Sequence, residues 1–326
     1  MARCLQLAEN GRGTSFPNPM VGSVIVRDQK IVSEGWHHSP GGRHAEAHAI
    51  YNCDPKKLDG ATLYVNLEPC NHVGRTEACA PLIVTSGIKK VVIGSGDTHH
   101  KVNGSGIEHL KNHGIEVTTG VLEQECRKLN KRFFRFHEQK RPYIVLKWAE
   151  TKNNFVAPLT KNELRPVWIT NEYARQHTHF LRSREQAIMV GHKTWTQDTP
   201  RLSAYRWNEN NPKIVILGGQ QPQVIHDQSK SSVDSPQNTP IWLSSQIYKG
   251  PQQVATKLHE LEIQSVLVEG GPKTLQGFID ANLWDECYCY KSDSLWQEGL
   301  KGPKINIPLT PIARFEDNVL WYGNNQ

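Results

Sequence analysis

Four residues in two short segments have the types and the order needed to hold a catalytic zinc ion. His44 and Glu46 lie in "GGRHAEAHAI", and Cys70 and Cys79 lie in "LEPCNHVGRTEACAP". Zinc binds Cys thiolates and His nitrogens, and a catalytic zinc keeps one of its positions for water. His44, Cys70 and Cys79 would supply three ligands and leave that position open. Zinc lowers the pKa of bound water toward neutrality, so a hydroxide becomes available to attack an amidine-like carbon.

The spacing of Glu46 suits proton transfer better than metal binding. Glu46 lies two residues after His44, and residues two apart do not share a face of a helix. Its carboxyl would take a proton from the zinc-bound water and give it to the leaving amine. Zinc-dependent nucleobase deaminases have this His-x-Glu and Pro-Cys pattern, but with cysteines two residues apart; here eight residues separate them. A structural zinc site is the alternative, since His48 or His72 could complete four protein ligands.

The elements expected around these residues alternate between strand and helix. His44 would begin a helix, Cys70 would follow a strand, and Cys79 would open another helix. This alternation predicts an α/β fold. The expected strands cover 20–28, 30–37, 61–70, 89–97 and 115–121, and the expected helices cover 44–53, 79–87, 104–114 and one long charged segment, 122–141.

A second α/β unit is expected after the long charged helix, which should end before Pro142. The boundary near residue 140 gives two predicted domains, 1–140 and 141–326. A polar segment rich in Gln, Ser and Pro, 220–240, predicts a loop within the second domain. The expected strands of this domain cover 142–150, 186–194, 212–219, 240–245, 265–272 and 285–292, and a helix is expected over 273–283.

Composition limits the classes of function. The chain has 326 residues, a net charge of +6 and no apolar run near the ~20 residues of a membrane span. The positive charge suits an anionic substrate, but it is too diffuse for a nucleic-acid surface. Seven cysteines in a chain of this size favour the reducing cytoplasm over a disulfide scaffold. Cys287 and Cys289 alternate along one expected strand, which predicts core packing.

Several motifs together resemble one enzyme family. The segments "PNPMVGSVIV", "HAEAHAI", "LEPCNHVGRTEAC" and "RPYIVLKWAE" are similar to the bifunctional deaminase–reductases of riboflavin biosynthesis. The resemblance implies a cytidine-deaminase-like α/β/α domain followed by a dihydrofolate-reductase-like α/β domain. It also implies zinc-dependent hydrolytic deamination of 2,5-diamino-6-(5-phosphoribosylamino)pyrimidin-4(3H)-one, and then NADPH-dependent reduction of the ribosyl group to ribityl. The partner is then a phosphoribosylated pyrimidine, with no nucleic acid and no membrane, and a homo-oligomer is left open.

The resemblance also implies roles for individual residues. His44, Cys70 and Cys79 would bind zinc, and Glu46 would be the proton shuttle. The positions that match the family's substrate-binding residues are Asn18, His72, Arg75, Thr76, Asp97, Lys147, Arg182, Leu202, Arg206 and Glu269. The positions that match its cofactor-binding residues are Trp168, Thr194, Asp198, Gly271, Pro272, Lys273, Thr274 and Leu275.

The chain also departs from the family pattern, mostly in the second domain. The family's "SLDG" is "TKNN" at 151–154, and Pro166 replaces a serine of the family. The loop that begins at Asp97 reads "DTHH". One alternative is therefore a deaminase whose second domain is a weakened reductase. Another is a deaminase of nucleic-acid bases, which predicts a basic channel lined by aromatic residues and a Cys-x-x-Cys pair. Neither feature is evident in the sequence.

Overall fold

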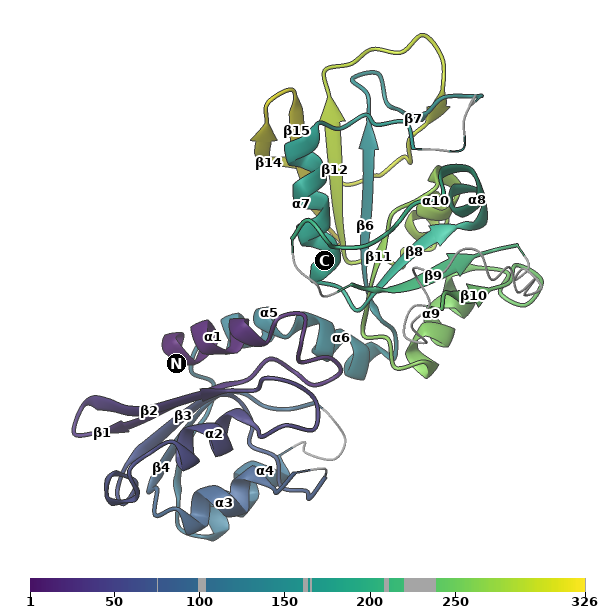
Figure 1. Cartoon of the computed structure of the whole chain (residues 1–326). Coiled ribbons are helices and arrows are strands. Elements are labelled where there is room, and N and C mark those ends of the chain that lie inside the picture. The colour runs from purple at the N-terminus through teal and green to yellow at the C-terminus, as the bar shows by residue number, and fades with distance from the viewer. Residues whose placement is uncertain are drawn as a thin grey trace, which may run out of the picture. The chain divides into compact units, whose positions relative to one another are not determined.

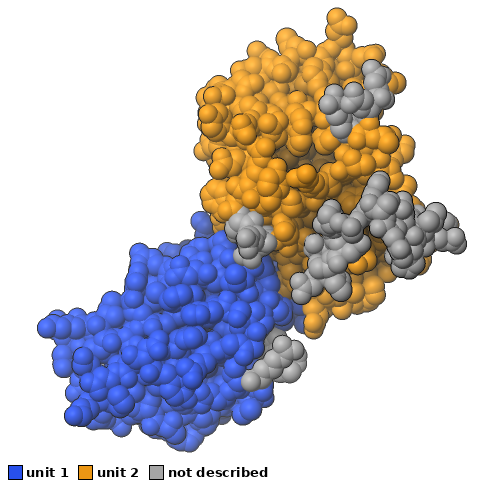
Figure 2. Space-filling view, in the orientation of Figure 1, with its two compact units in different colours: residues 1–140 blue, residues 141–326 orange. Residues whose placement is uncertain are grey.

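The computed structural model describes residues 1–74, 76–98, 104–160, 164, 166–207, 211–219 and 239–325. The chain divides into two compact units, Met1–Lys140 and Arg141–Gln326 (Figure 2). Each unit has its own sheet and its own hydrophobic core. Within the described ranges, no helix has both the length and the apolar composition of a membrane span. Residues 220–238 of the expected polar loop fall outside the description.

The first unit is a five-stranded sheet between two layers of helices (Figure 1). Its strands are β1 (Gly22–Arg27), β2 (Lys30–Trp36), β3 (Thr62–Leu67), β4 (Lys90–Ser95) and β5 (Glu116–Thr118), and its helices are α1 (Ala2–Ala8), α2 (Ala45–Tyr51), α3 (Cys79–Thr85), α4 (Ser105–Asn112), α5 (Glu123–Leu129) and α6 (Lys131–Gln139). The strand order is β2-β1-β3-β4-β5. β1 is antiparallel to β2 and β3, whereas β3, β4 and β5 are parallel.

Alternation along the strands explains why both faces of this sheet are covered. Ile25 packs with Leu63 and Ile83 beneath α2, α3 and α4, whereas its neighbour Val24 packs with Leu7 of α1. Successive strand residues point to opposite faces, so a strand that is apolar throughout must be buried on both. Each fully buried side chain of this size contributes about 1.5–3 kcal/mol to folding.

The single long helix expected over 122–141 is wrong, because the structure has two helices that meet at Asn130. The Asn130 side chain accepts a hydrogen bond from the Met20 backbone N–H at 2.8 Å and donates to the Met20 carbonyl at 2.9 Å. These bonds hold Asn130 at a point where its backbone leaves helical geometry, with φ of −99° and ψ of 23°. This contact, which is far away in sequence, gives no signal in the local pattern.

The second unit is built on an eight-stranded sheet, and a two-stranded β13-β7 ribbon accompanies it (Figure 1). Its strands are β6 (Tyr143–Glu150), β7 (Phe155–Ala157), β8 (Ala187–Gly191), β9 (Lys213–Leu217), β10 (Ile241–Leu243), β11 (Ser265–Val268), β12 (Glu286–Ser292), β13 (Leu300–Lys301), β14 (Thr310–Phe315) and β15 (Asn318–Asn324), and its helices are α7 (Glu172–Ser183), α8 (His192–Asp198), α9 (Pro251–Glu260) and α10 (Pro272–Asp280). The sheet order is β10-β9-β8-β11-β6-β12-β15-β14, parallel from β10 to β12 and antiparallel after it.

Two apolar clusters hold this sheet. Leu258 of α9 and Phe278 of α10 pack on one face, where Cys287 and Cys289 are fully buried as expected. Leu181 of α7 packs on the other face. The strand expected over 186–194 is too long, because it ends at Gly191 and α8 begins at the next residue. Helix α9 and the β14–β15 hairpin were not among the elements expected from the sequence.

Candidate functional site

The three expected zinc ligands meet at one point in the first unit. The ligand atoms of His44, Cys70 and Cys79 all lie within 4.8 Å of one another. His44 Nδ1 lies 3.5 Å from Cys70 Sγ and 3.3 Å from Cys79 Sγ. All three belong to different elements, so the group exists only because the fold brings them together.

Local structure explains how each ligand is presented. His44 is the extended N-cap of α2, Cys70 follows β3, and Cys79 is the first residue of α3. Helix α2 can lie this close to β2 because position 35 is Gly: a Cβ there would meet the Ala45 carbonyl at 2.5 Å. The Cys79 backbone N–H points at Cys70 Sγ, 3.4 Å away, which fixes the second sulfur relative to the first.

The electrostatics of the group suit a cation. Hydrogen bonds from the Cys79 thiol and from His44 lower the pKa of Cys70 to about 4. The same sulfur pairing, with burial, raises the pKa of Cys79. Thiolates are the form that binds zinc, and two sulfurs with one imidazole nitrogen form a donor set that zinc prefers. These residues therefore fit zinc.

The number of ligands separates a catalytic site from a structural one. Among the described residues, the group contains three ligands and not four. His48 stacks instead on His38, with ring centroids 4.3 Å apart. His72 is also outside the group, and its buried Nδ1 has no hydrogen-bond partner in the described part of the chain. Three protein ligands leave one position for a reactant, as in catalytic zinc sites.

Glu46 lies in the first turn of α2 and is 3% exposed. Burial raises its pKa to about 7, although the nearby His44 opposes this shift. A carboxyl with a pKa near neutrality can both accept and return a proton, which is what a proton shuttle must do.

A cavity of about 340 Å³ opens beside this group. Four of the substrate-binding positions that the family resemblance implies line this cavity: Asn18, His72, Thr76 and Asp97. Thr76 also places its hydroxyl 3.5 Å from His44 Nε2. Arg75, and residues 99–100 of the "DTHH" loop, lie outside the described residues.

Two further residues of this cavity were missed from the sequence. His37 Nε2 lies 2.9 Å from the Asn18 side-chain nitrogen, and His37 Nδ1 lies 3.1 Å from the Arg43 carbonyl. Glu68 is buried, and its carboxylate accepts four backbone N–H groups, from Asp97, Gly104, Gly106 and Ile107. Both roles depend on backbone groups that are brought near by folding. The sequence carries no pattern for such contacts.

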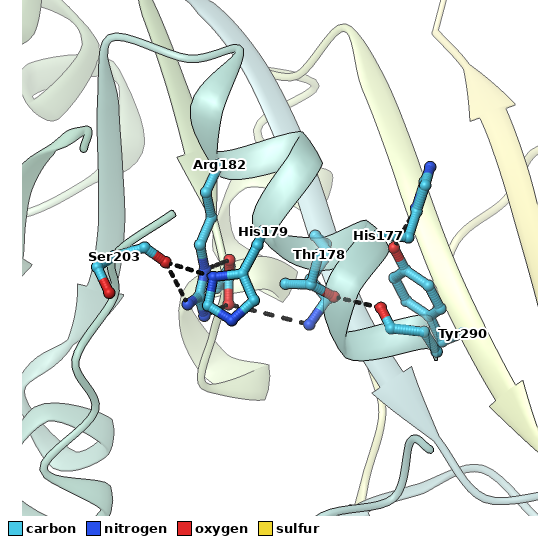
Figure 3. Close-up of polar contacts among 9 residues, drawn as sticks. His177, Thr178, His179, Arg182, Ser203 and Tyr290 are labelled. Atoms are coloured by element: carbon cyan, nitrogen blue, oxygen red, sulfur yellow. Dashed lines mark hydrogen bonds and ion pairs between the residues drawn. The ribbon is translucent and has the colours of Figure 1, made fainter. Parts of the chain in front are cut away.

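In the second unit, three of the expected substrate residues form a buried charge group. Arg182 donates two hydrogen bonds to Glu269, each 2.7 Å long. Lys147 Nζ lies 3.9 Å from the same carboxylate. The burial of Glu269 would raise its pKa, but the charges of Arg182 and Lys147 lower it to about 2. Figure 3 shows the Arg182 side chain extending from α7.

The other two expected substrate residues of this unit lie on the loop after α8. Leu202 is buried with φ of 55° and packs against Ile188 and Val190. Arg206 makes different contacts, with Glu172 at 2.9 Å and with the Tyr205 hydroxyl at 3.1 Å. In the described part of the chain, no contact joins Arg206 to the Lys147, Arg182 and Glu269 group.

The expected cofactor residues gather partly at the ends of two parallel strands. The Gly191 N–H donates to the Gly270 carbonyl at 2.8 Å, so the turns after β8 and β11 touch. A Cβ on Gly191 would meet the Thr274 hydroxyl at 2.8 Å, and one on Gly271 would meet the Thr194 hydroxyl at 3.2 Å. Helices α8 and α10 start at these turns with no side-chain cap, so their N–H groups are available to a phosphate.

The remaining cofactor positions are distributed more widely. Pro272, Lys273 and Leu275 belong to the first turn of α10, where Lys273 is exposed and Leu275 is buried. Asp198 is the last residue of α8. Trp168 is 62% exposed, and the Arg175 guanidinium lies over its ring at 4.9 Å.

The "TKNN" segment forms an ordered turn between β6 and β7. The Thr151 hydroxyl donates to the Asn153 side chain at 2.8 Å and accepts from the Phe155 N–H at 3.0 Å. Asn154 has φ of 65°, a conformation that Asn adopts more easily than most residues other than Gly. The replacement therefore keeps a tight turn here. Nothing in the structure bears on Pro166.

A pH-dependent stability is expected from His177 of α7. Its Nδ1 lies 2.7 Å from the Tyr290 hydroxyl (Figure 3). Burial, with the charges of Arg184 and Lys147, lowers its pKa from 6.5 to about 4. The folded state thus prefers neutral His177, so its contribution is present above pH 6.5 and is lost as the pH falls through about 4.

The matched variant is His177→Asn, which keeps a hydrogen-bond acceptor near the Tyr290 hydroxyl but does not titrate. Urea unfolding of both proteins across this pH range should show a steeper loss of stability in the wild type. Parallel curves for the two proteins would contradict the assignment.

Comparisons with known proteins agree with this site. Residues 1–95 match the cytidine and deoxycytidylate deaminase zinc-binding region, and residues 142–292 match the RibD C-terminal domain. The chain is 37% identical to riboflavin biosynthesis protein RibD of Aquifex aeolicus, over 94% of this chain and 90% of the relative. It is 33% identical to RibD of Escherichia coli, over 93% of this chain and 89% of the relative.

Two solved structures are similar over almost the whole chain. One is a diaminohydroxyphosphoribosylaminopyrimidine deaminase/5-amino-6-(5-phosphoribosylamino)uracil reductase from Thermotoga maritima, with a TM-score of 0.82, 34% identity, and 99% and 96% of the two chains covered. The other is RibD of Acinetobacter baumannii, with a TM-score of 0.87, 27% identity, and 98% and 96% covered.

The fold and the sites define a two-part enzyme, in which a zinc-dependent deaminase of the cytidine-deaminase-like fold precedes an NADPH-dependent reductase of the dihydrofolate-reductase-like fold. The chain belongs to the RibD family of bifunctional deaminase–reductases of riboflavin biosynthesis. The predicted fold class, the two activities and the two cofactors are thereby confirmed. The family match decides against the nucleic-acid deaminase and the structural zinc module.

Proposed function

We propose that unit 1–140 deaminates 2,5-diamino-6-(5-phosphoribosylamino)pyrimidin-4(3H)-one, and that unit 141–326 then reduces the ribosyl side chain of the product to ribityl with NADPH. The observation that carries the first step is the group of His44, Cys70 and Cys79 with buried Glu46 at the wall of one cavity. The Thermotoga maritima relative is described as acting on compounds of this class. Seven unpaired cysteines support a reducing cytoplasm as the place of action.

The deaminating residues would divide the work as follows. Bound zinc supplies Lewis acidity at the open side of the three-ligand group. Glu46 takes the proton of the attacking water and returns it to the departing amine. No acid or base from solution is then needed for ammonia to leave. Asn18, His72, Thr76 and Asp97 line the cavity and would orient the pyrimidine and its phosphoribosyl group. Orientation of the ring against the nucleophile supplies a large part of such rate enhancements.

The reducing residues would hold substrate and cofactor on neighbouring parts of one sheet. Lys147, Arg182 and Glu269 offer fixed charges and hydrogen-bond donors to the substrate. The turns after β8 and β11, with Thr194 and Thr274, offer backbone N–H groups and hydroxyls to a phosphate of NADPH. Hydride transfer is the chemistry of the cofactor, and the chain supplies orientation.

One assay tests both halves. Zinc-loaded protein is mixed with the phosphoribosylated diaminopyrimidinone and NADPH, and ammonia release and NADPH oxidation are followed together. Equal yields of both are expected, and a chelator should remove ammonia release. When the deaminated intermediate is supplied directly, NADPH oxidation should survive chelation, because the candidate zinc group of His44, Cys70 and Cys79 belongs to the first unit. Ammonia without NADPH oxidation would show a deaminase with a weakened reductase, and no ammonia would reject the proposal.

A further inference from the structure

One backbone carbonyl in the second unit is held by two side chains of the same helix. The Ser203 carbonyl accepts a hydrogen bond from His179 Nδ1 at 2.7 Å and another from an Arg182 terminal nitrogen at 3.1 Å. His179 and Arg182 are three residues apart on α7, so they share one face of the helix. Figure 3 shows both side chains converging on Ser203.

The proton position on His179 follows from its partner. A carbonyl oxygen can only accept, so the hydrogen bond requires the proton on Nδ1. The His179 side chain is buried, and its ring packs edge-on against Tyr205 with centroids 4.8 Å apart. The ring is therefore fixed in position by packing and in tautomer by the carbonyl.

The two donors to Ser203 are not equivalent. Arg182 uses its Nε and one terminal nitrogen for Glu269, and only the other terminal nitrogen reaches Ser203. Its position is therefore set mainly by the buried carboxylate. Among the described residues, the His179 ring makes its side-chain hydrogen bond to the Ser203 carbonyl only, and this bond is the shorter of the two.

The carbonyl that they hold belongs to a loop in an unusual conformation. Leu202, directly before Ser203, has φ of 55°, in the left-handed region that costs energy for a residue with a branched side chain. Beyond Ser203, the Ala204 N–H donates to the Asn211 side chain at 2.8 Å. The peptide group that joins Ser203 to Ala204 is thus held by polar contacts at both its carbonyl and its N–H, directly after Leu202.

We propose that His179 is a positioning residue for the reduction, because its hydrogen bond to the Ser203 carbonyl holds Leu202 where the reductase substrate binds. The inference rests on the proposed function of the second unit, and on Leu202 being one of the substrate-binding positions that the family resemblance implies. His179 acts through the loop and does not touch the reacting atoms.

The test compares two replacements of His179 in the full-length, zinc-loaded enzyme. His179→Asn places an amide N–H near the position of Nδ1 and can keep the bond to Ser203. His179→Leu fills similar space without a donor. NADPH oxidation is measured against the concentration of the deaminated, phosphoribosylated aminouracil and, separately, of NADPH. Ammonia release from the diaminopyrimidinone is the control within the same chain.

For His179→Leu, we expect the KM for the aminouracil to rise about tenfold, the size of effect that one lost hydrogen bond to a buried acceptor gives. The KM for NADPH and the rate of ammonia release should be unchanged, and His179→Asn should stay within about twofold of the wild type. This split between two KM values, with rescue by Asn, is not expected from general loss of folding.

Three results would overturn the inference. An unchanged aminouracil KM in His179→Leu would show that the bond to Ser203 does not place the loop. A loss of NADPH binding together with substrate binding would show a role in folding only. A wild type that releases ammonia but does not oxidise NADPH would reject the reductase proposal itself, and with it the role of His179. If the wild type oxidises NADPH and His179→Leu keeps the wild-type KM for the aminouracil, only the positioning role is rejected.

Discussion

Glu46→Gln should lower the rate of ammonia release by about 10²–10⁴-fold, the range that a positioned general acid and base contributes. Gln has nearly the same shape as Glu and leaves the packing of α2 intact, but it cannot carry a proton between water and amine. Glu46 is also outside the group of three zinc ligands, so metal content should not fall. The loss should therefore appear in kcat with zinc still bound.

The measurement combines ammonia release with zinc content by atomic absorption. NADPH oxidation from the deaminated intermediate should be unchanged, because Glu46 belongs to the first unit only. Glu77→Gln is the matched control, since Glu77 is an exposed carboxylate of the first unit that accepts a hydrogen bond from the Tyr51 hydroxyl. A Glu46→Gln protein that keeps zinc and most of its deaminase rate would reject the proton-shuttle role.

The group of candidate zinc ligands could be predicted from the sequence, because it depends on residue types and short spacings. His44 and Glu46 are almost adjacent, and each Cys lies at the expected end of a strand or a helix. Zinc tolerates few side chains, so the two cysteines and one histidine restrict the possible sites strongly. The structure needed only to bring them within reach, and it does.

The supporting residues of the same cavity could not be predicted, because most of their partners are backbone groups. Among the described residues, Glu68 accepts hydrogen bonds from the N–H groups of Asp97, Gly104, Gly106 and Ile107. His37 matters through the Arg43 carbonyl and the Asn18 amide. Such bonds depend on the register and the path of the main chain. Neither residue belongs to a pattern of spacing that indicates its role.

The sequence also did not predict two features of the fold and the contacts of Arg206. Asn130 divides the expected long helix because it bonds to Met20, more than a hundred residues away. The β14–β15 hairpin is exposed along much of β14, and its strand does not alternate clearly between apolar and polar residues. Arg206 was matched to a substrate position of the family although it lies one residue later than the pattern expects, and its side chain pairs with Glu172. The helix break at Asn130 and the pairing of Arg206 thus involve contacts between residues far apart in sequence, whereas β14 lacks a clear strand pattern.

The second large effect is expected at Glu269, whose carboxylate lies between two buried cations. Its side chain is 8% exposed, and those of Arg182 and Lys147 are each 13% exposed. Glu269→Gln would leave both positive charges without a counter-ion in a poorly solvated place. Removing one partner of a buried ion pair costs about 3–5 kcal/mol. The second unit should therefore become much less stable, and its NADPH oxidation should fall.

The pH dependence of the stability gives an independent test of the same charge group. Although burial would raise the pKa of Glu269, the charges of Arg182 and Lys147 lower it from 4.5 to about 2. The ionised carboxylate thus contributes stability that is present above pH 4.5 and is lost as the pH falls through about 2. Glu269→Gln removes this titration, so its stability should change less than that of the wild type in acid.

The experiment compares urea unfolding of the full-length wild type, Glu269→Gln and Glu260→Gln at neutral and acidic pH. Glu260 is the matched control, because it also pairs with a cation, Lys257 at 3.0 Å, but on the exposed side of α9. Exposed pairs of this kind contribute little, so Glu260→Gln should unfold like the wild type. Amides of β6 and β11 should lose hydrogen-exchange protection in Glu269→Gln only, because these strands carry Lys147 and lead into Glu269. If Glu269→Gln unfolds like Glu260→Gln, the buried charges are solvated or paired in another way, and the contacts of Glu269 with Arg182 and Lys147 do not carry the stability of this unit.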